Sequence, residues 1–252
     1  MPSKSEISFV RSLHQKKFRD AENSFIAEGP KVVGELLQSG YTVSKIFSVK
    51  EFAEKKFQDK IFNDRSTIVS GSELKKISAL TTPNRVIAVA EIPKQKINYD
   101  VINKSISIVL DGVSDPGNLG TILRIAHWFG IENIICSENS VDAYNPKVVQ
   151  AAMGSLFFVN VVQTNLEELF AQKKISVPVY GTVLNGKSIY QTKLISPAII
   201  LLGNESAGIS GELNSFITHP VSIPSAVQKG KHKPDSLNVA AAAAIVCAAL
   251  RS

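Results

Sequence analysis

The amino-acid sequence predicts an α/β protein in which a mostly parallel β-sheet is covered by helices on both faces. Short apolar runs that suit buried strands alternate with amphipathic segments through the second half of the 252-residue chain. This order is typical of parallel sheets. Hydrophobic residues make up 44% of the chain and charged residues 20%, a balance that supports a sizeable buried core and argues against disorder.

The first hundred residues are expected to form a smaller α/β domain. Pro30 suits the first position of a helix that continues to a stop at Gly40. Predicted strands cover 43–49, 66–71 and 85–92, and a further predicted helix covers 72–80. The segment 93–105 is polar, begins with a proline and shows little periodicity. We therefore place a boundary near residue 100 and predict domains over 1–100 and 101–252.

The second domain alternates more strictly between strands and helices. Its predicted strands cover 105–110, 132–137, 157–162, 177–183, 198–203 and 219–224, and its predicted helices cover 119–129, 145–155, 165–174, 211–217 and 238–251. Ligands of such sheets bind beyond the carboxyl ends of the strands. Three loop segments begin at predicted strand ends, namely 111–124, 201–210 and 223–239. These segments form the candidate site.

The common nucleotide-binding and metal-binding patterns do not fit this chain. The glycines of segment 111–124 lack the spacing of a dinucleotide fingerprint, and Ile209 occupies the position where a P-loop needs a lysine. The sequence has no HExxH pattern and no GxSxG turn. Its two cysteines, Cys136 and Cys247, are far apart and outside any CxxC pattern. We therefore expect neither an NTPase, a hydrolase nor a metal centre.

Segment 111–124 carries an amide and a cation at the start of a predicted helix. Asn118 follows a turn cluster and fits a helix N-cap, a ligand contact, or both. Arg124 lies among mostly apolar residues of the same helix. It fits either an anion-binding guanidinium or a surface side chain that extends to water.

The other two segments add a carboxylate, a hydroxyl and a second amide. Glu205 lies in a glycine loop just past a predicted strand, as a site carboxylate or as an exposed loop charge. Ser236 and Asn238 precede the last helix, and capping explains only one of them.

A basic loop precedes that last helix. It contains Lys229, Lys231 and Lys233. These lysines suit either phosphate contacts or solvent. Because the chain also carries a net charge of +6, a polyanionic partner such as RNA is favoured.

Taken together, the three segments resemble the motifs of the SpoU/TrmH family of RNA 2′-O-ribose methyltransferases. The first motif, roughly D-P-x-N-x-G-x-x-x-R, is matched by Asp115, Pro116, Asn118, Gly120 and Arg124. The second, an apolar strand followed by G-x-E-x-x-G, is matched by Gly203, Glu205 and Gly208. The third, I-P and later S-L-N-V before a helix of small residues, is matched by Ile223, Pro224, Ser236, Leu237, Asn238 and Val239. Three such motifs in order over residues 106–250 are specific.

The resemblance implies a SPOUT domain, which is a parallel-sheet α/β domain with a deep trefoil knot. It also implies an N-terminal substrate-binding domain similar to a small ribosomal-protein fold, matched more softly by Lys17, Arg19, Phe25, Glu28 and Gly29. The implied methyl donor is S-adenosyl-L-methionine (AdoMet), and the implied assembly is a homodimer with the site near the interface.

The resemblance also assigns roles to residues of the three segments and to Thr182. The residues implied to hold AdoMet are Thr182, Leu202, Gly203, Ile223 and Leu237. The residues implied to act in catalysis are Asn118, Arg124, Glu205, Ser236 and Asn238. The family assigns activation of the ribose hydroxyl to Arg124. A guanidinium does not lose its proton near neutral pH, so we expect Arg124 to orient the substrate while a substrate phosphate or Glu205 accepts the proton.

The chain departs from the family pattern in its third motif. The loop 225–235 is longer and more basic than expected, Ser225 stands where methionine is common, and Ala240 stands where serine is common. Two alternatives stay open: a non-catalytic RNA-binding protein with this fold, and an RNA base methyltransferase on a related knotted fold. By analogy, rRNA is favoured over tRNA as substrate. Without a secretory signal or a run of ~20 apolar residues, the sequence predicts a cytoplasmic protein.

Overall fold

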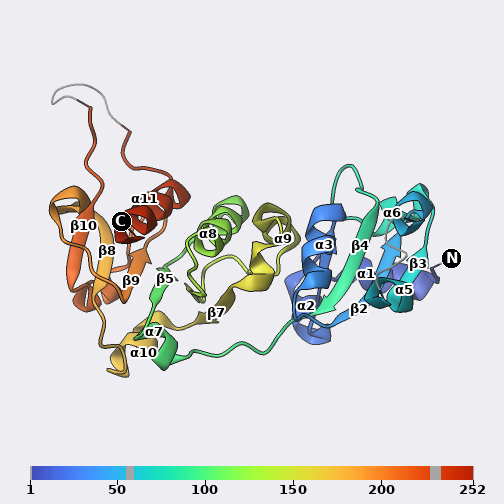
Figure 1. Cartoon of the computed structure of the whole chain (residues 1–252), viewed down its shortest axis with the longest axis horizontal. Helices are drawn as coiled ribbons and strands as arrows, with labels where there is room; N and C mark the ends of the chain where they lie inside the picture. Colours follow the sequence, from blue (N-terminus) through green and yellow to red (C-terminus); the bar gives the residue numbers. More distant parts are fainter. Residues whose placement is uncertain (1, 55–59, 228–233, 252) are drawn as a thin grey trace. The chain divides into compact units, whose positions relative to one another are not determined.

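The computed structural model describes residues 2–54, 60–227 and 234–251. The chain divides into two compact units (Figure 1). The first unit comprises Met1–Lys94 together with Asp142–Phe158, and the second comprises Gln95–Val141 together with Val159–Ser252. The chain therefore leaves the second unit after Val141 and rejoins it at Val159.

The first unit is built on a four-stranded sheet. Its strands are β1 (Ser24–Glu28), β2 (Val43–Ser48), β3 (Ser66–Ile68) and β4 (Val86–Glu91), in the order β1-β4-β2-β3. Strand β4 runs antiparallel to both of its neighbours, and β3 runs parallel to β2. The apolar run of β4 is fully buried from Val86 to Ala90, which is typical of a central strand that is covered on both faces.

Helices cover this sheet. They are α1 (Lys4–Ser12), α2 (Lys16–Glu22), α3 (Pro30–Gln38), α4 (Lys50–Ala53), α5 (Lys60–Arg65) and α6 (Gly71–Ile77). Helix α1 begins at a capping box, in which Ser3 and Glu6 satisfy each other's backbone N–H groups. Pro30 is the first residue of α3, as predicted, and Gly29 before it has a φ of +90° that a residue with a side chain rarely adopts.

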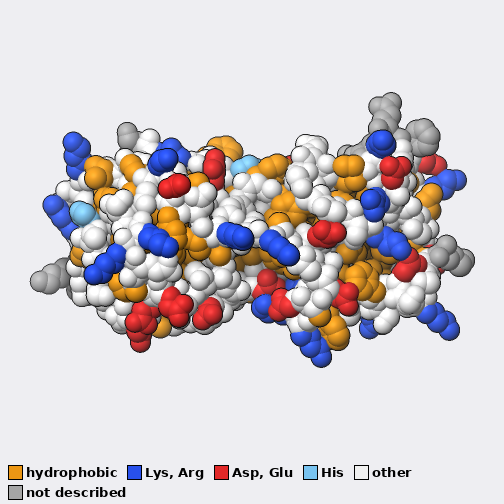
Figure 2. Space-filling view, turned by 90° about the horizontal axis from the view of Figure 1, so that it is seen from below, with side chains coloured by type: hydrophobic (Ala, Val, Ile, Leu, Met, Phe, Trp, Pro, Cys, Tyr) orange, Lys and Arg blue, Asp and Glu red, His pale blue; other side chains and the backbone are white. Residues whose placement is uncertain are grey.

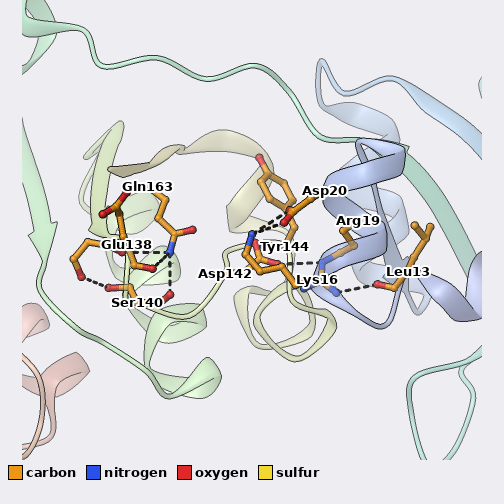
Figure 3. A network of polar contacts seen from close by, with 10 residues as sticks. Leu13, Lys16, Arg19, Asp20, Glu138, Ser140, Asp142, Tyr144 and Gln163 are labelled. Carbon is orange, nitrogen blue, oxygen red and sulfur yellow. Dashed lines mark hydrogen bonds and ion pairs between the residues drawn. The ribbon is translucent and has the colours of Figure 1, made fainter. Parts of the chain in front are cut away.

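The segment Asp142–Phe158 completes the first unit. It contains α9 (Pro146–Ala152) and the 3₁₀-helix η2 (Ser155–Phe158). Asp142 Oδ2 accepts hydrogen bonds from Nε and Nη2 of the buried Arg19 at 3.0 and 2.5 Å (Figure 3). Tyr144 packs on Phe25 with ring centroids 5.0 Å apart. Because Tyr144 is buried beside Tyr41, the pKa of each phenol is raised, chiefly by desolvation.

The second unit is built on a six-stranded sheet in which every neighbouring pair is parallel. Its strands are β5 (Ile106–Leu110), β6 (Asn133–Ser137), β7 (Asn160–Thr164), β8 (Val179–Ser188), β9 (Ala198–Leu202) and β10 (His219–Ser222), in the order β10-β8-β9-β5-β6-β7. The predicted α/β class with a parallel sheet is confirmed.

Helices lie on both faces of this sheet. They are α7 (Tyr99–Ile102), α8 (Pro116–Trp128), α10 (Leu166–Ala171) and α11 (Val239–Arg251), with the 3₁₀-helices η3 (Ile189–Gln191) and η4 (Gly211–Phe216). On one face α8 packs against α11, and on the other α7, α10 and η4 share a core with alternate residues of the central strands (Figure 1). Among the described helices, none is long and apolar enough to cross a membrane.

Several elements differ from the sequence-based expectation. Helix α8 begins at Pro116, not at residue 119, because Asp115 and not Asn118 is its N-cap. Residues 157–158 belong to η2, and β7 begins only at Asn160. Helices α1 and α2 and strand β1 were not predicted, although β1 is buried along its whole length. In β1 the segment SFIAE is too short to separate strand from helix by its period.

Candidate functional site

Asn118 is the residue around which the site is organised. Asp115 Oδ1 accepts from the backbone N–H of Asn118 at 2.8 Å, and Pro116 occupies the first position of α8. Since Asp115 caps the helix, the side-chain amide of Asn118 does not have to. The half-buried amide is available for contacts with other segments.

The Asn118 amide joins the three segments that the sequence singled out. Its Nδ2 donates to Glu205 Oε1 at 2.5 Å, and its Oδ1 accepts from Asn238 Nδ2 at 2.8 Å. Residues far apart in the sequence, after β5, after β9 and before α11, therefore form one directional network from Asn238 through Asn118 to the Glu205 carboxylate. We call it the amide–carboxylate network.

Asn238 has a second task in this network. Its Oδ1 accepts from the backbone N–H groups of Ala240 and Ala241 at 3.0 and 3.2 Å, so Asn238 caps the start of α11. The cap fixes the side-chain torsion and directs Nδ2 at Asn118. Capping and site geometry are thus functions of the same amide, and Ser236, which is exposed, is not needed as a cap.

The loop 203–210, which carries Glu205, is held by its own backbone. A Cβ added at Gly203 would lie 2.1 Å from the carbonyl carbon of Gly208 and 2.3 Å from the Ile209 nitrogen, so only glycine fits there. Asn204 and Gly208 exchange two backbone hydrogen bonds of 2.9 Å. Asn204 Oδ1 also accepts from the backbone N–H groups of Ser206 and Ala207. Glu205 therefore lies within a closed, internally bonded loop.

Two residues that the sequence analysis missed tie this loop to the end of β5. Buried Asp111 accepts from Ser210 N–H through Oδ2 at 2.7 Å, and Asn204 Nδ2 donates to the Gly112 carbonyl at 2.8 Å. Asp111 could have been noticed as a carboxylate placed directly after a buried strand, where an ionised group needs fixed donors. Both bonds hold Glu205 within reach of Asn118.

Arg124 and Ser236 are not brought into contact with this network. Both side chains are exposed, and among the described residues neither has a hydrogen-bond or ion-pair partner. Arg124 lies six positions after Asn118 on α8, which is about 9 Å along the helix axis. Its guanidinium therefore lies on the same helix as Asn118 and is available to bind an external anion.

The residues expected to hold AdoMet lie within β8 (Thr182), at the end of β9 (Leu202 and Gly203), after β10 (Ile223) and before α11 (Leu237). Leu202 is buried, Gly203 and Ile223 are half-buried, and Thr182 donates from Oγ1 to the Leu201 carbonyl at 3.2 Å. Leu237 is 50% exposed, although it is a large apolar side chain. A tightly packed glycine backbone and an exposed apolar side chain each suit a planar, partly apolar ligand such as adenosine, so these residues fit the group.

Two further expectations concern the basic loop and metals. Lys229, Lys231 and Lys233 lie outside the described residues, so their phosphate contacts stay a prediction. Within the described part of the chain, no group of three or more His, Cys, Asp or Glu residues could hold a metal ion. Cys136 and Cys247 are free thiols, and burial raises the pKa of each to about 12.

Residues 105–248 match the model of the SpoU rRNA Methylase family. The chain belongs to the SpoU rRNA methylase family. Residues 4–88 match the model of the MRM3-like substrate binding domain. The predicted family and the class of AdoMet-dependent RNA methyltransferase are thereby confirmed, whereas the roles of single site residues stay predictions.

Relatives of this SpoU family member are similar over nearly the whole chain. The 23S rRNA (guanosine(2553)-2'-O)-methyltransferase RlmP of Bacillus subtilis is 33% identical over 248 residues, which cover 96% of this chain and 94% of the relative. A putative RNA methyltransferase of the TrmH family from Porphyromonas gingivalis is 37% identical with a TM-score of 0.88, covering 99% of this chain and 98% of its own. An AdoMet-bound rRNA methyltransferase from Sinorhizobium meliloti is 30% identical with a TM-score of 0.83, covering 99% of this chain and 95% of its own.

Proposed function

We propose that this SpoU family member transfers the methyl group of AdoMet to the ribose 2′-hydroxyl of a nucleotide in rRNA. The observation that carries the proposal is the amide–carboxylate network, in which Asn238 donates to Asn118 and Asn118 donates to Glu205. It joins the three motif loops at one edge of the sheet. A protein that had kept only RNA binding would not need a chain of two amides that ends on a carboxylate.

Glu205 is the group that accepts the hydroxyl proton in this proposal. One carboxylate oxygen, Oε1, is occupied by Asn118, and the other has no partner among the described residues. A hydroxyl is a weak nucleophile at neutral pH and gains reactivity when a positioned base accepts its proton. AdoMet, when bound, supplies an electrophilic methyl group on a sulfonium. The ribose hydroxyl would lie in line with that methyl group, and Glu205 Oε2 would accept the hydroxyl proton.

Arg124 orients the RNA in this proposal and does not act as a base. Its guanidinium is exposed and unpaired among the described residues, and it keeps its proton at neutral pH. Guanidinium groups bind phosphate through paired N–H donors. Arg124 would hold the phosphate next to the target ribose, and Ser236 would contact the substrate from the loop before α11.

The choice of rRNA rests on the relatives and on the first unit. The Bacillus subtilis relative is named as a 23S rRNA 2'-O-methyltransferase, and residues 4–88 match a substrate-binding model. On the face that Figure 2 shows, Lys and Arg side chains of the described residues are interspersed with acidic ones. On this face charge alone therefore does not mark an RNA-binding surface, and a substrate-binding unit that reads RNA shape is consistent with it.

We further propose the trefoil knot and the homodimer that the family resemblance implies. The match of residues 105–248 to the SpoU rRNA Methylase family model supports both proposals. We also propose a cytoplasmic location, which the similarity to the Bacillus subtilis relative supports. We also propose that residues 1–100 bind RNA and residues 101–252 transfer the methyl group, although the segment 142–158 packs with the first unit.

The proposal is tested by labelled-methyl transfer from AdoMet to an unmodified large-subunit rRNA transcript. Arg124→Ala should abolish transfer, and Glu205→Gln should lower its rate by about 10²–10⁴-fold, the usual contribution of a general base. AdoMet affinity, measured by calorimetry, should be unchanged in both. Glu167→Gln, an exposed carboxylate on α10, is the matched control. Near-normal transfer by Arg124→Ala or Glu205→Gln would contradict the assigned roles.

A further inference from the structure

The loop after β6 is built more firmly than a surface turn requires. Gln163 Nε2 on β7 donates to the carbonyls of Ser137, Glu138 and Ser140 at 3.2, 3.0 and 2.9 Å (Figure 3). Ser140 Oγ lies 2.9 Å from Ser137 Oγ, which accepts from the backbone N–H of Gly112 at 2.8 Å. One side chain thus fixes three carbonyls, and a serine pair fixes the loop to the end of β5.

This construction orients the amide of Asn139. Ser137 Oγ donates to Asn139 Oδ1 at 2.5 Å, so the acceptor atom of the amide points into the loop. The donor atom, Nδ2, has no hydrogen-bond partner among the described residues, and the side chain is exposed. A fixed amide with a free donor costs conformational entropy, and a bond to a ligand would offset that cost.

Asn139 lies beside the first two motif loops. A Cβ added at Gly112 would lie 3.5 Å from Asn139 Nδ2 and also 3.5 Å from Asn204 Cβ. Asn139 and Asn204 therefore flank the same point of the backbone, and Asn204 precedes Glu205 in the chain. The free donor of Asn139 is thus adjacent to the loop that carries the proposed base.

The strand order places this donor on the substrate side of the site. The sheet runs β10-β8-β9-β5-β6-β7, and the residues that fit AdoMet lie within β8, at the end of β9, after β10 and before α11. The first motif follows β5, and the loop of Asn139 follows β6, which lies on the far side of β5 from the AdoMet residues. A ligand group that reaches Asn139 is therefore part of the RNA and not of the methyl donor.

We propose that Asn139 is a substrate-positioning residue whose Nδ2 donates a hydrogen bond to an acceptor oxygen of the nucleotide that is methylated. The inference rests on the proposed RNA methyl transfer. The acceptor belongs to the base or to the adjoining phosphate, since both present oxygens that an amide N–H binds.

The test compares two isosteric variants in methyl transfer to the unmodified rRNA transcript. Asn139→Asp keeps an oxygen for Ser137 and replaces the free donor by a second oxygen. Its KM for RNA should rise about fivefold, the usual effect of one lost hydrogen bond to a substrate, while its AdoMet affinity and melting temperature should match those of the parent. Asn214→Asp, an exposed asparagine of η4, adds the same charge and should change none of these quantities. Asn139→Ala should raise the KM without the added charge.

Substrates altered at the mapped target nucleotide identify the acceptor. If the acceptor is a phosphate oxygen, a phosphorothioate beside the target should raise the KM for RNA of the parent but not that of Asn139→Asp. If the acceptor is on the base, an abasic target should raise the KM of the parent but not that of Asn139→Asp. The inference would be overturned if the substrate change and Asn139→Asp raised the KM additively with both altered substrates. It would also be overturned if the KM for RNA of Asn139→Asp and Asn139→Ala stayed within twofold of the parent. Loss of AdoMet binding in the same variants would overturn it in favour of a structural role. A parent that transfers no methyl group would instead refute the proposed function.

Discussion

Removal of the Asp142 carboxylate should destabilise the first unit strongly, because it leaves a buried cation without its anion. Arg19 is 2% exposed, and two of its nitrogens donate to Asp142 Oδ2 at 3.0 and 2.5 Å. Its remaining bond is from Nη1 to the Leu13 carbonyl at 2.9 Å. Breaking a buried ion pair by removing one partner costs about 3–5 kcal/mol. Asp142→Ala should lower the free energy of unfolding by that amount.

The reverse substitution should cost less. Asp142 is already 15% exposed in the intact pair, and Tyr144 N–H donates to its Oδ1 at 2.9 Å. Arg19→Met should therefore cost about 1–3 kcal/mol, as for a lost charged hydrogen bond. In the double variant Arg19→Met with Asp142→Leu the two costs should not add, because neither charge is left unpaired.

Urea unfolding followed by circular dichroism measures these free energies, and hydrogen exchange locates the effect. In Asp142→Ala, exchange should rise in α2 and in residues 142–158, which the pair joins, while β9 in the second unit should keep its protection. A cost below about 1 kcal/mol for Asp142→Ala, or equal loss of protection in β9, would refute the view that this pair fastens 142–158 to the first unit.

Three further predictions follow from single contacts. Gly203→Ala should lower the melting temperature and weaken AdoMet binding in calorimetry, since overpacking against backbone costs about 1–3 kcal/mol or more. Gly211→Ala, whose added Cβ meets nothing within 4 Å, is the control. An unchanged melting temperature and AdoMet affinity in Gly203→Ala would contradict the packing. Burial raises the pKa of Cys136 and Cys247 to about 12. At pH 8 the native protein should therefore not react with a thiol reagent, whereas the unfolded protein should react with two equivalents. Fast labelling of the native protein would contradict the burial of these thiols. Lys45 holds the pKa of Glu6 at about 2, below its ordinary 4.5, so the pair stabilises the fold above pH 4.5 and this contribution is lost as the pH falls from 4.5 to 2. The difference in unfolding free energy between the parent and Lys45→Met should shrink over that window, and a difference constant from pH 6 to 2 would exclude the ion pair as its cause.

Much of the second unit could be predicted from sequence because its signals are local. Apolar runs such as those of β5 and β9 indicate their elements without long-range information. The carboxyl ends of parallel strands share an edge, so Asn118 and Glu205 could be expected to approach each other. Their hydrogen bond required the structure, since it depends on Asp115, and not Asn118, being the N-cap of α8.

Features that depend on distant partners could not be predicted in this way. Nothing local in the segment 142–158 indicates that it packs with the first unit, since the decisive contacts are with Arg19 and Phe25, more than a hundred positions earlier. Arg19 itself resembles a surface residue of a polar helix until Asp142 is placed beside it. Asn139 carries no motif at all, and its interest comes only from bonds made by Gln163 and Ser137.

The identity of the methylated product tests the central claim most directly. An unmodified large-subunit rRNA transcript is incubated with the enzyme and labelled AdoMet, digested with nucleases that require a free 2′-hydroxyl, and the labelled products are separated. The account predicts that the label appears in nuclease-resistant 2′-O-methyl dinucleotides, and that Glu205→Gln forms the same product far more slowly. Label in methylated bases, or no label in RNA while AdoMet binds, would contradict it.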